Sequence, residues 1–481
     1  MSYILDRIPA SRDLLLLLFV VLIVLTIIPF GSVTSFPFSF AAIGMFVLAI
    51  IGGVLFGEPQ HARPAFRIAL AMLAILATWT FTQTIALPNN WLENPVWRSV
   101  RQVVGGQPGA ISVEPADTRN SILFVALPFM TFLTGLCLCD SDQRAQWLIK
   151  AMGVTSGLVA VFGLLQFGAS PGTLIAIKKV AYLDSLTAVF VNRNTAATFF
   201  GVGLLTLAIL LHTTARSVAA YPVGRPGRTA KLVLMALYAV LLCSCFTALM
   251  LSRSRAGIAS TFVATLILVL WVAASSKANG LAVSMLRRVP SAVRIVVSGT
   301  MILLVFLSFS GQVILRAKER ELLDDDRLCI LPGIWRAVSD HWVAGTGLGT
   351  FRTVFSSYRD PSCGIFGVFD RAHNFYLEGF LGLGIVFLIT LIVALAALGA
   401  IFFRGVKHRR RGRAFVVLGI CATILVLLHG TVDFSLQIPG FAIFFAALLS
   451  GTVSISLGRR STRPGNTHRD YPTGTMLTPE W

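Results

Sequence analysis

Four groups of polar residues lie where long apolar runs begin or end, and their side chains are of the kinds that bind anions and move protons. The groups are residues 192–195, 252–255, 371–378 and 429–437. Ionisable side chains are costly at the depth of a bilayer, so those found there are candidates for function by default. Because all four groups border apolar runs on the same side of the predicted membrane, we expect them to lie near one another.

Three of these groups put a cation or an imidazole at the start of an apolar helix. The free N–H groups and the positive dipole end of a helix N-terminus favour an anion, and arginine adds a planar fork of donors suited to phosphate oxygens. A lone arginine at a helix end more often extends into lipid headgroups, so the prediction depends on the coincidence of three such starts. The predicted diphosphate site consists of Arg193, Arg253, Arg255, Asn194 and Asn374.

A diphosphate at the outer membrane surface, where nucleotides are scarce, indicates a sugar linked to a polyprenyl diphosphate. The corresponding reaction is glycosyl transfer, in which an acceptor hydroxyl attacks the anomeric carbon and the lipid diphosphate leaves. Arginine neutralises such a leaving group. His373, with an ordinary pKa near ~6.5, is one candidate base for the hydroxyl, and Glu378 is the other. The alternative for His373 is to donate a hydrogen bond to phosphate.

The composition indicates the elements that must position these groups. The chain has 481 residues, of which 56% are hydrophobic and only 13% charged, and its mean hydropathy is +0.80, so we predict an all-α polytopic membrane protein. Continuous apolar runs exclude an alternating barrel strand pattern. About twelve runs are long enough to cross a bilayer: residues 14–30, 38–56, 66–87, 121–139, 147–168, 195–212, 231–251, 256–275, 292–309, 375–403, 414–432 and 440–458.

The distribution of basic residues predicts the orientation of these spans. With both termini cytoplasmic, 24 of the 40 Lys and Arg residues fall on the inner face and 16 on the outer face, 8 of these in one long loop. This positive-inside asymmetry explains the net charge of +19 without nucleic acid. We predict one transmembrane domain over residues 1–458, an outer loop inserted at 310–372, and a disordered cytoplasmic tail at 459–481.

The outer loop has its own local signals. Residues 313–323 and 334–338 have the spacing of amphipathic helices, and the glycines at 345, 347 and 349 predict a tight turn that lets Phe351 pack back onto the membrane face. The consecutive aspartates at 324–326 indicate a solvated turn and not a metal site. Cys329 and Cys363 share this loop, so a disulfide is expected in an oxidising compartment, two free thiols being the alternative. No cysteine spacing indicates zinc.

Five motifs in order resemble the O-antigen ligase and polysaccharide polymerase superfamily of bacterial membrane glycosyltransferases. The resemblance spans about residues 150–450. Its motifs are Asn192-Arg193-Asn194-Thr195-Ala-Ala, Ser252-Arg253-Ser254-Arg255-Ala-Gly, Trp335-Arg336 with Gly345-x-Gly-x-Gly349-x-Phe351, His373-Asn374-x-x-Leu377-Glu378 with Gly382-Leu-Gly384, and His429-Gly-x-x-Asp433-Phe-x-Leu-Gln437-Ile-Pro439.

The resemblance implies a metal-independent, inverting glycosyltransferase with no cofactor, located in the bacterial inner membrane with its active site on the periplasmic face. It implies an undecaprenyl-diphosphate-linked glycan as donor and essential roles for His373, for Arg255 or Arg253, and for a loop arginine. Arg327 stands eight residues before Trp335 and Arg336 directly after it, so both remain candidates for the loop arginine, and both are added to the predicted diphosphate-binding residues.

The acceptor is left open by the sequence. The acceptor is lipid A core for a ligase, a second lipid-linked glycan for a polymerase, and a protein for a third branch of the superfamily. We favour the first two because the sequence shows no appended periplasmic domain. The rival class is a transporter or flippase of lipid-linked saccharides. That class needs charged residues at the bilayer midplane, whereas the predicted spans hold almost no internal charge.

Overall fold

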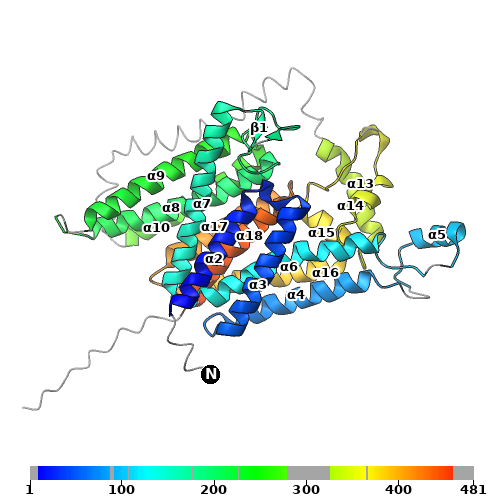
Figure 1. The fold of residues 1–481 in the computed structure, drawn as a ribbon, viewed down its shortest axis with the longest axis horizontal. Helices are drawn as coiled ribbons and strands as arrows, with labels where there is room; N and C mark the ends of the chain where they lie inside the picture. The colour runs from blue at the N-terminus through cyan, green and yellow to red at the C-terminus, as the bar shows by residue number, and fades with distance from the viewer. Residues whose placement is uncertain are drawn as a thin grey trace, which may run out of the picture.

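The computed structural model describes residues 9–86, 91–106, 108–175, 177–222, 224–225, 227–278, 326–363 and 367–458, and the regular structure in this part of the chain is helical apart from one pair of short strands (Figure 1). Ten helices within it are long and apolar enough to cross a membrane. They are α3 (Ser35–Phe56), α4 (Arg63–Gln83), α6 (Pro115–Leu138), α7 (Asp142–Ala169), α8 (Arg193–Ala219), α9 (Arg228–Leu251), α10 (Arg255–Ala278), α16 (Ile385–His408), α17 (Arg413–Gly430) and α18 (Pro439–Leu457).

The predicted spans therefore agree closely with the helices of the described chain. The first predicted span corresponds to the apolar helix α2 (Pro9–Ile27). The predicted span at 292–309, the amphipathic segment at 313–323 and the tail at 459–481 lie outside the described residues. The remaining elements are short: η1 (Phe30–Ser32), α5 (Val96–Val104), the antiparallel pair β1 (Thr173–Leu174) and β2 (Ile177–Lys178), α13 (Asp326–His341), α14 (Phe351–Ser356), η2 (Pro361–Cys363), α15 (Phe375–Leu383) and η3 (Ser435–Gln437).

The prediction of one continuous span over residues 375–403 is wrong. The run is divided into α15 and α16 by Gly384, whose φ of 62° lies in the left-handed region. A Cβ at this position would stand 2.3 Å from the carbonyl oxygen of Val343 and 2.7 Å from the amide nitrogen of Gly345. The break therefore depends on a close approach of two backbones that are distant in sequence.

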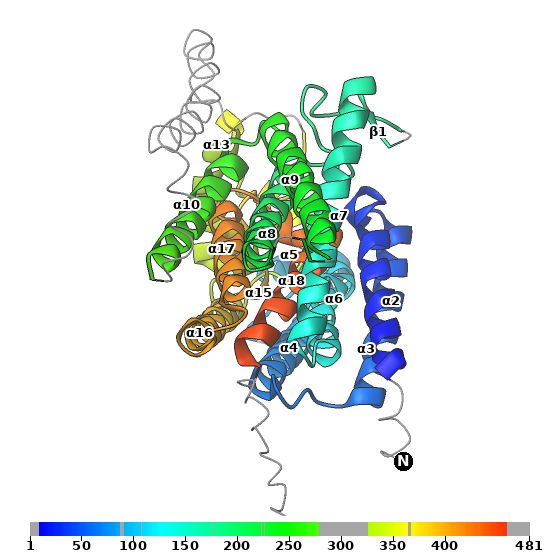
Figure 2. The same ribbon diagram turned by 90° about the vertical axis from the view of Figure 1, so that its left-hand side faces the viewer.

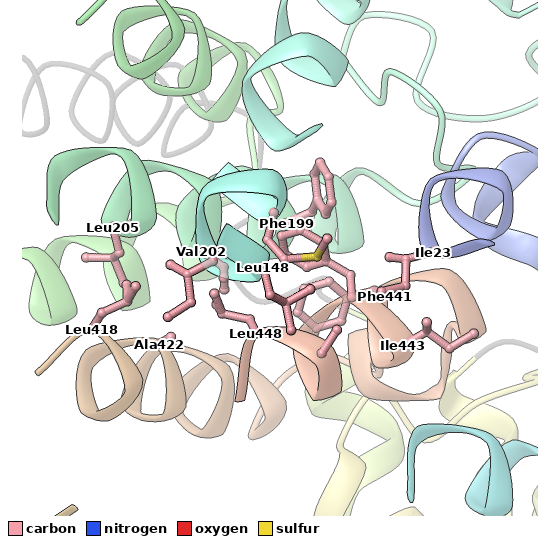
Figure 3. Close-up of a cluster of buried hydrophobic side chains, with 14 of the residues drawn as sticks. Ile23, Leu148, Phe199, Val202, Leu205, Leu418, Ala422, Phe441, Ile443 and Leu448 are labelled. Atoms are coloured by element: carbon pink, nitrogen blue, oxygen red, sulfur yellow. The ribbon is translucent and has the colours of Figure 1, made fainter. Parts of the chain in front are cut away.

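Helices α8 and α18 form the centre of the bundle (Figure 2). Most of their side chains are buried, whereas only about a fifth of those of α3 and α16 are buried. Figure 3 shows how Phe199 and Val202 of α8 lie beside Leu148 of α7 and Phe441 and Leu448 of α18. Exposed apolar side chains on the outer helices are those expected where a helix faces lipid.

A small second core organises the predicted outer loop. Ile334 of α13, Phe351 and Phe355 of α14 and Leu381 of α15 are buried together, and the three short helices lie together in Figure 1. The predicted glycine turn of residues 345–349 has positive φ at all three glycines, and Phe351 after it is buried in this loop core. Two bonds join this turn to the end of α15, from Thr346 N to Leu381 O (2.8 Å) and from Gly347 N to Gly382 O (3.0 Å).

A disulfide fastens the ends of this loop core. It joins Cys329 in α13 to Cys363 in η2, with 5.7 Å between the two Cα atoms, which is the pairing predicted from their shared loop. The short helix predicted at 334–338 is part of the longer α13, which begins at Asp326. The loop core thus holds α13 and α14 against α15, directly beside the residues predicted to act.

Candidate functional site

Asn374 sets the start of α15. Its side-chain oxygen accepts from the N–H groups of Tyr376 and Leu377, both at 3.0 Å, and so caps the helix. Its side-chain nitrogen donates to the carbonyl oxygen of Thr431 at 2.8 Å, beyond the end of α17. Asn374 was predicted to bind the diphosphate, but both its side-chain oxygen and its side-chain nitrogen form hydrogen bonds within the protein. These bonds fix α15 to the end of α17.

Glu378 anchors the turn that precedes α15. Its carboxylate is 8% exposed and accepts from Arg371 Nη1 at 3.0 Å and from the N–H of Ala372 at 2.8 Å. Burial raises the pKa of Glu378 above its ordinary value, while Arg371, the Ala372 N–H and Gln437 act in the opposite direction. Each oxygen already has a donor, so this geometry suits a residue that holds the backbone of the turn.

His373 lies between these two anchors. Its backbone has a φ of 52°, uncommon for a residue with a side chain, and it is held by Ala372 on one side and Asn374 on the other. The half-buried imidazole packs edge-to-face against Phe434, with 5.1 Å between ring centroids. The turn therefore fixes the direction of the predicted base before any substrate arrives.

The starts of α8 and α10 are joined directly. Asn192 caps α8 by accepting from the N–H of Asn194 at 2.7 Å, and the hydroxyl of Ser254 donates to the side-chain oxygen of Asn194 at 2.8 Å. Arg193 and Arg255 are the first residues of the two helices. The sequence predicted that these two arginine-bearing helix N-termini lie near each other. In the structure they are in contact, joined by one buried hydrogen bond.

The three arginines of this pair of helix starts have different surroundings. The Arg193 guanidinium lies over the ring of Tyr182, 5.1 Å from its centroid. Arg253, in the turn between α9 and α10, has a φ of 53° and forms an ion pair with Asp184. Arg255 is exposed. Cationic groups therefore cluster on this surface, as an anion site requires.

A buried polar chain connects these helix starts to the end of α17. Thr198 Oγ1 lies 2.5 Å from His429 Nδ1 and 3.0 Å from Ser435 Oγ, and Ser435 donates to Asp433. Thr198 also donates to the carbonyl oxygen of Asn194 at 2.9 Å. Sequence analysis singled out His429 and Asp433 but missed Thr198 and Ser435, whose only signal was the four-residue spacing of Thr198 from Asn194.

Of the two candidates for the loop arginine, the structure describes the side chain of one. The side chain of Arg327 is outside the described residues, and Arg336 is exposed on α13. Arg371 is the loop arginine that the structure brings against Glu378, two residues before His373. Its position in that motif was visible in the sequence, but nothing there indicated which acid it would meet.

An apolar cavity of about 560 Å³ opens beside this turn. It runs between α4, α6, α16 and α18, where Met72, Phe129 and Leu398 are among the apolar residues that line it. Polar side chains gather where the cavity meets the turn, and they are Arg352, Asp370, Arg371, Glu378 and Gln437. Its shape and lining suit a hydrocarbon chain with a polar head.

Within the described residues, no group of three or more His, Cys, Asp or Glu side chains is arranged to hold a metal ion. The charged groups of the site are instead arginines, an imidazole and buried carboxylates. Side chains of these types are suited to anion binding and proton transfer, and Arg371 and Glu378 line the apolar cavity.

Comparison with known families identifies one region of the chain. Residues 237–392 match the model of the family described as O-Antigen ligase. The match includes the α9–α10 turn, the loop core and the His373 turn, whereas the start of α8 and the segment around His429 lie outside it. No curated protein matches the chain.

Proposed function

We propose that this membrane protein with an O-antigen ligase domain transfers glycan from an undecaprenyl-diphosphate donor to an acceptor hydroxyl. The observation that carries the proposal is the hydrogen-bonded connection of two arginine-bearing helix starts with the segment that packs against His373. It runs from Ser254 through Asn194 and Thr198 to Ser435, next to Phe434. This connection supports an anion site and an imidazole acting on one substrate pair.

The arginines account for the leaving group. The donor diphosphate gains negative charge as its bond to the anomeric carbon breaks, and Arg193, Arg253 and Arg255 neutralise that charge with preorganised donors. The start of α8 adds the positive end of a helix dipole. After transfer, these arginines hold the lipid diphosphate that has left the sugar.

His373 accounts for the proton. In a single displacement that inverts the anomeric centre, the acceptor hydroxyl attacks, its proton passes to the His373 imidazole, and the bond to the diphosphate breaks. An imidazole is half-protonated near ~6.5 in the absence of perturbation, which suits a base at neutral pH. Glu378 positions His373 through Ala372 and Arg371, and Asn374 completes the turn.

The apolar cavity supports a lipid-linked substrate. A hydrocarbon chain between α4, α6, α16 and α18 would bring its polar head to Arg371 and Gln437, beside the His373 turn. This arrangement favours a ligase or polymerase, whose acceptors are themselves lipid-linked. We assign the site to the periplasmic face of the bacterial inner membrane on the positive-inside asymmetry.

Reconstitution tests the proposal. The full chain in liposomes, supplied with an undecaprenyl-diphosphate-linked glycan, should form new glycosidic bonds and release lipid diphosphate. His373→Ala and Arg255→Ala should each lower the rate by about a hundredfold or more, whereas Arg404→Ala and His408→Ala, at the far end of α16, should act as wild type.

Two results would refute this assignment. Normal transfer by both His373→Ala and Arg255→Ala would exclude the site. Movement of lipid-linked sugar across the bilayer without a new glycosidic bond would instead establish a flippase.

A further inference from the structure

Asp184 is an acid on the cationic surface of the proposed donor site. It lies between β2 and α8 and pairs with Arg253. Burial tends to raise the pKa of Asp184, but Arg253, the Ser185 hydroxyl and Arg193 outweigh it and hold the pKa below its ordinary value. The carboxylate is therefore charged at neutral pH and stands where the proposed function requires an anion.

We propose that Asp184 is a place-holding anion, which neutralises Arg253 in the empty site and is displaced by the substrate's diphosphate. The inference rests on the proposed function and adds a residue that sets the affinity and charge selectivity of the same site. Asp184 does not touch the reacting bond, so its role is to compete for the arginine.

The exposure of the pair makes this exchange favourable. The Arg253 side chain is 43% exposed and that of Asp184 is 65% exposed, and ion pairs with this much access to water contribute little free energy. A diphosphate carries more charge than one carboxylate and offers several oxygens to the guanidinium fork. A ligand with a single charge has no comparable advantage over Asp184.

The backbone around the pair is fixed, so the exchange needs only a side-chain rotation. The N–H of Leu186 donates to the carbonyl oxygen of Leu251 at 2.9 Å, and Lys179 Nζ donates to the carbonyl oxygen of Ser185 at 3.0 Å. On the other side, Ser254 holds the turn through its bond to Asn194. The segment that carries Asp184 thus stays attached to the end of α9 when the ion pair opens.

The same competition acts on the product. After transfer, the lipid diphosphate remains on the arginines, and the returning carboxylate favours its release. Removing the carboxylate should therefore tighten diphosphate binding and slow turnover if release limits the rate. A residue that only anchored the segment would have neither effect.

The test measures binding of inorganic pyrophosphate and of inorganic phosphate to the full-length protein in detergent. Asp184→Asn should bind pyrophosphate about twofold to fivefold more tightly than wild type, the scale of one exposed ion pair. The affinity of Asp184→Asn for phosphate should rise by at least the same factor. The ratio of pyrophosphate affinity to phosphate affinity should therefore be smaller in the variant than in wild type. Asp184→Ser should behave like Asp184→Asn, and Asp184→Glu like wild type.

Glu58→Gln is the matched control, because it removes an acid that pairs with the exposed Arg67 far in sequence from the site, and it should leave pyrophosphate binding unchanged. If folded Asp184→Asn and Asp184→Ser bind pyrophosphate as wild type does or more weakly, the proposal is overturned. Asp184 would then only anchor its segment to the end of α9. If Arg253→Ala and Arg255→Ala bind pyrophosphate as wild type does, the donor site itself is wrong.

Discussion

Thr198 is a branch point of the buried polar chain. Its hydroxyl contacts the Asn194 carbonyl, His429 and Ser435, so one small side chain couples α8 to the end of α17 and to η3. Buried polar groups that lose a partner keep the full cost of their desolvation. The loss of this hydroxyl should therefore be felt both in stability and in the position of the helix starts.

Thr198→Val is expected to lower stability by about 1–3 kcal/mol, because it leaves His429 and Ser435 without their shared partner at nearly constant volume. Thermal unfolding in detergent measures the change, and transfer activity should fall with it. Thr206→Val is the control, since Thr206 is equally buried on the same helix but its hydroxyl returns to the Val202 carbonyl. Equal effects of the two variants would contradict a special role for Thr198.

At the scale of elements, the break between α15 and α16 determines where the His373 turn sits. Gly384 approaches the backbone of residues 343–345 so closely that no side chain fits. That contact fixes the end of α15 against the glycine turn, while Asn374 fixes its start against α17. A helix of nine residues is thereby held at both ends.

Gly384→Ala should destabilise the protein and reduce transfer strongly, because the new Cβ would collide with backbone and would sit at a positive φ. Thermal unfolding and activity report the two effects. Gly399→Ala, in the interior of α16 where a Cβ meets nothing within 4 Å, should be neutral or stabilising by up to about 1 kcal/mol. A well-folded, active Gly384→Ala protein would show that the break is dispensable.

The loop core should respond to pH through His341. Burial lowers the pKa of His341 in α13, with Asp340 acting in the opposite direction, so the folded state prefers the neutral imidazole. Its contribution to stability is present above the unfolded pKa of about 6.5 and is lost as pH falls below it. Acidification should therefore loosen α13, where His341 lies 3.3 Å from the Tyr358 hydroxyl.

The expected result is a fall in the unfolding temperature between about pH 7.5 and pH 5.5 that is smaller in His341→Gln than in wild type. Burial also lowers the pKa of His61, although Asp140 acts against it, so the difference between the two proteins isolates His341. Parallel pH profiles would contradict the prediction.

For the whole molecule, local signals in the sequence predicted the helices and the polar helix starts, because a polar residue before an apolar run marks a boundary without reference to the rest of the chain. Counting helix directions predicted only that the polar helix starts share one side of the membrane, and the contact between Asn194 and Ser254 is a finding of the structure. The break at Gly384 was missed because the run around it is continuously apolar and the contact that bends it comes from residues 343–345. The same limit hid the partner of Arg371 and the role of Thr198, which depend on packing between distant segments.

The central position of α18 bears on how the protein is made. Helices leave the ribosome in chain order, so α2, α6 and α7 are inserted well before the helix that packs against all three. Until then, the face of α6 at Gly135, which packs against Ser450 of α18, borders an open seam in the bilayer. A nascent chain stalled before residue 439 would lack the junction of η3 and α18, so the bundle centre and the site beside it would close only once α18 is inserted.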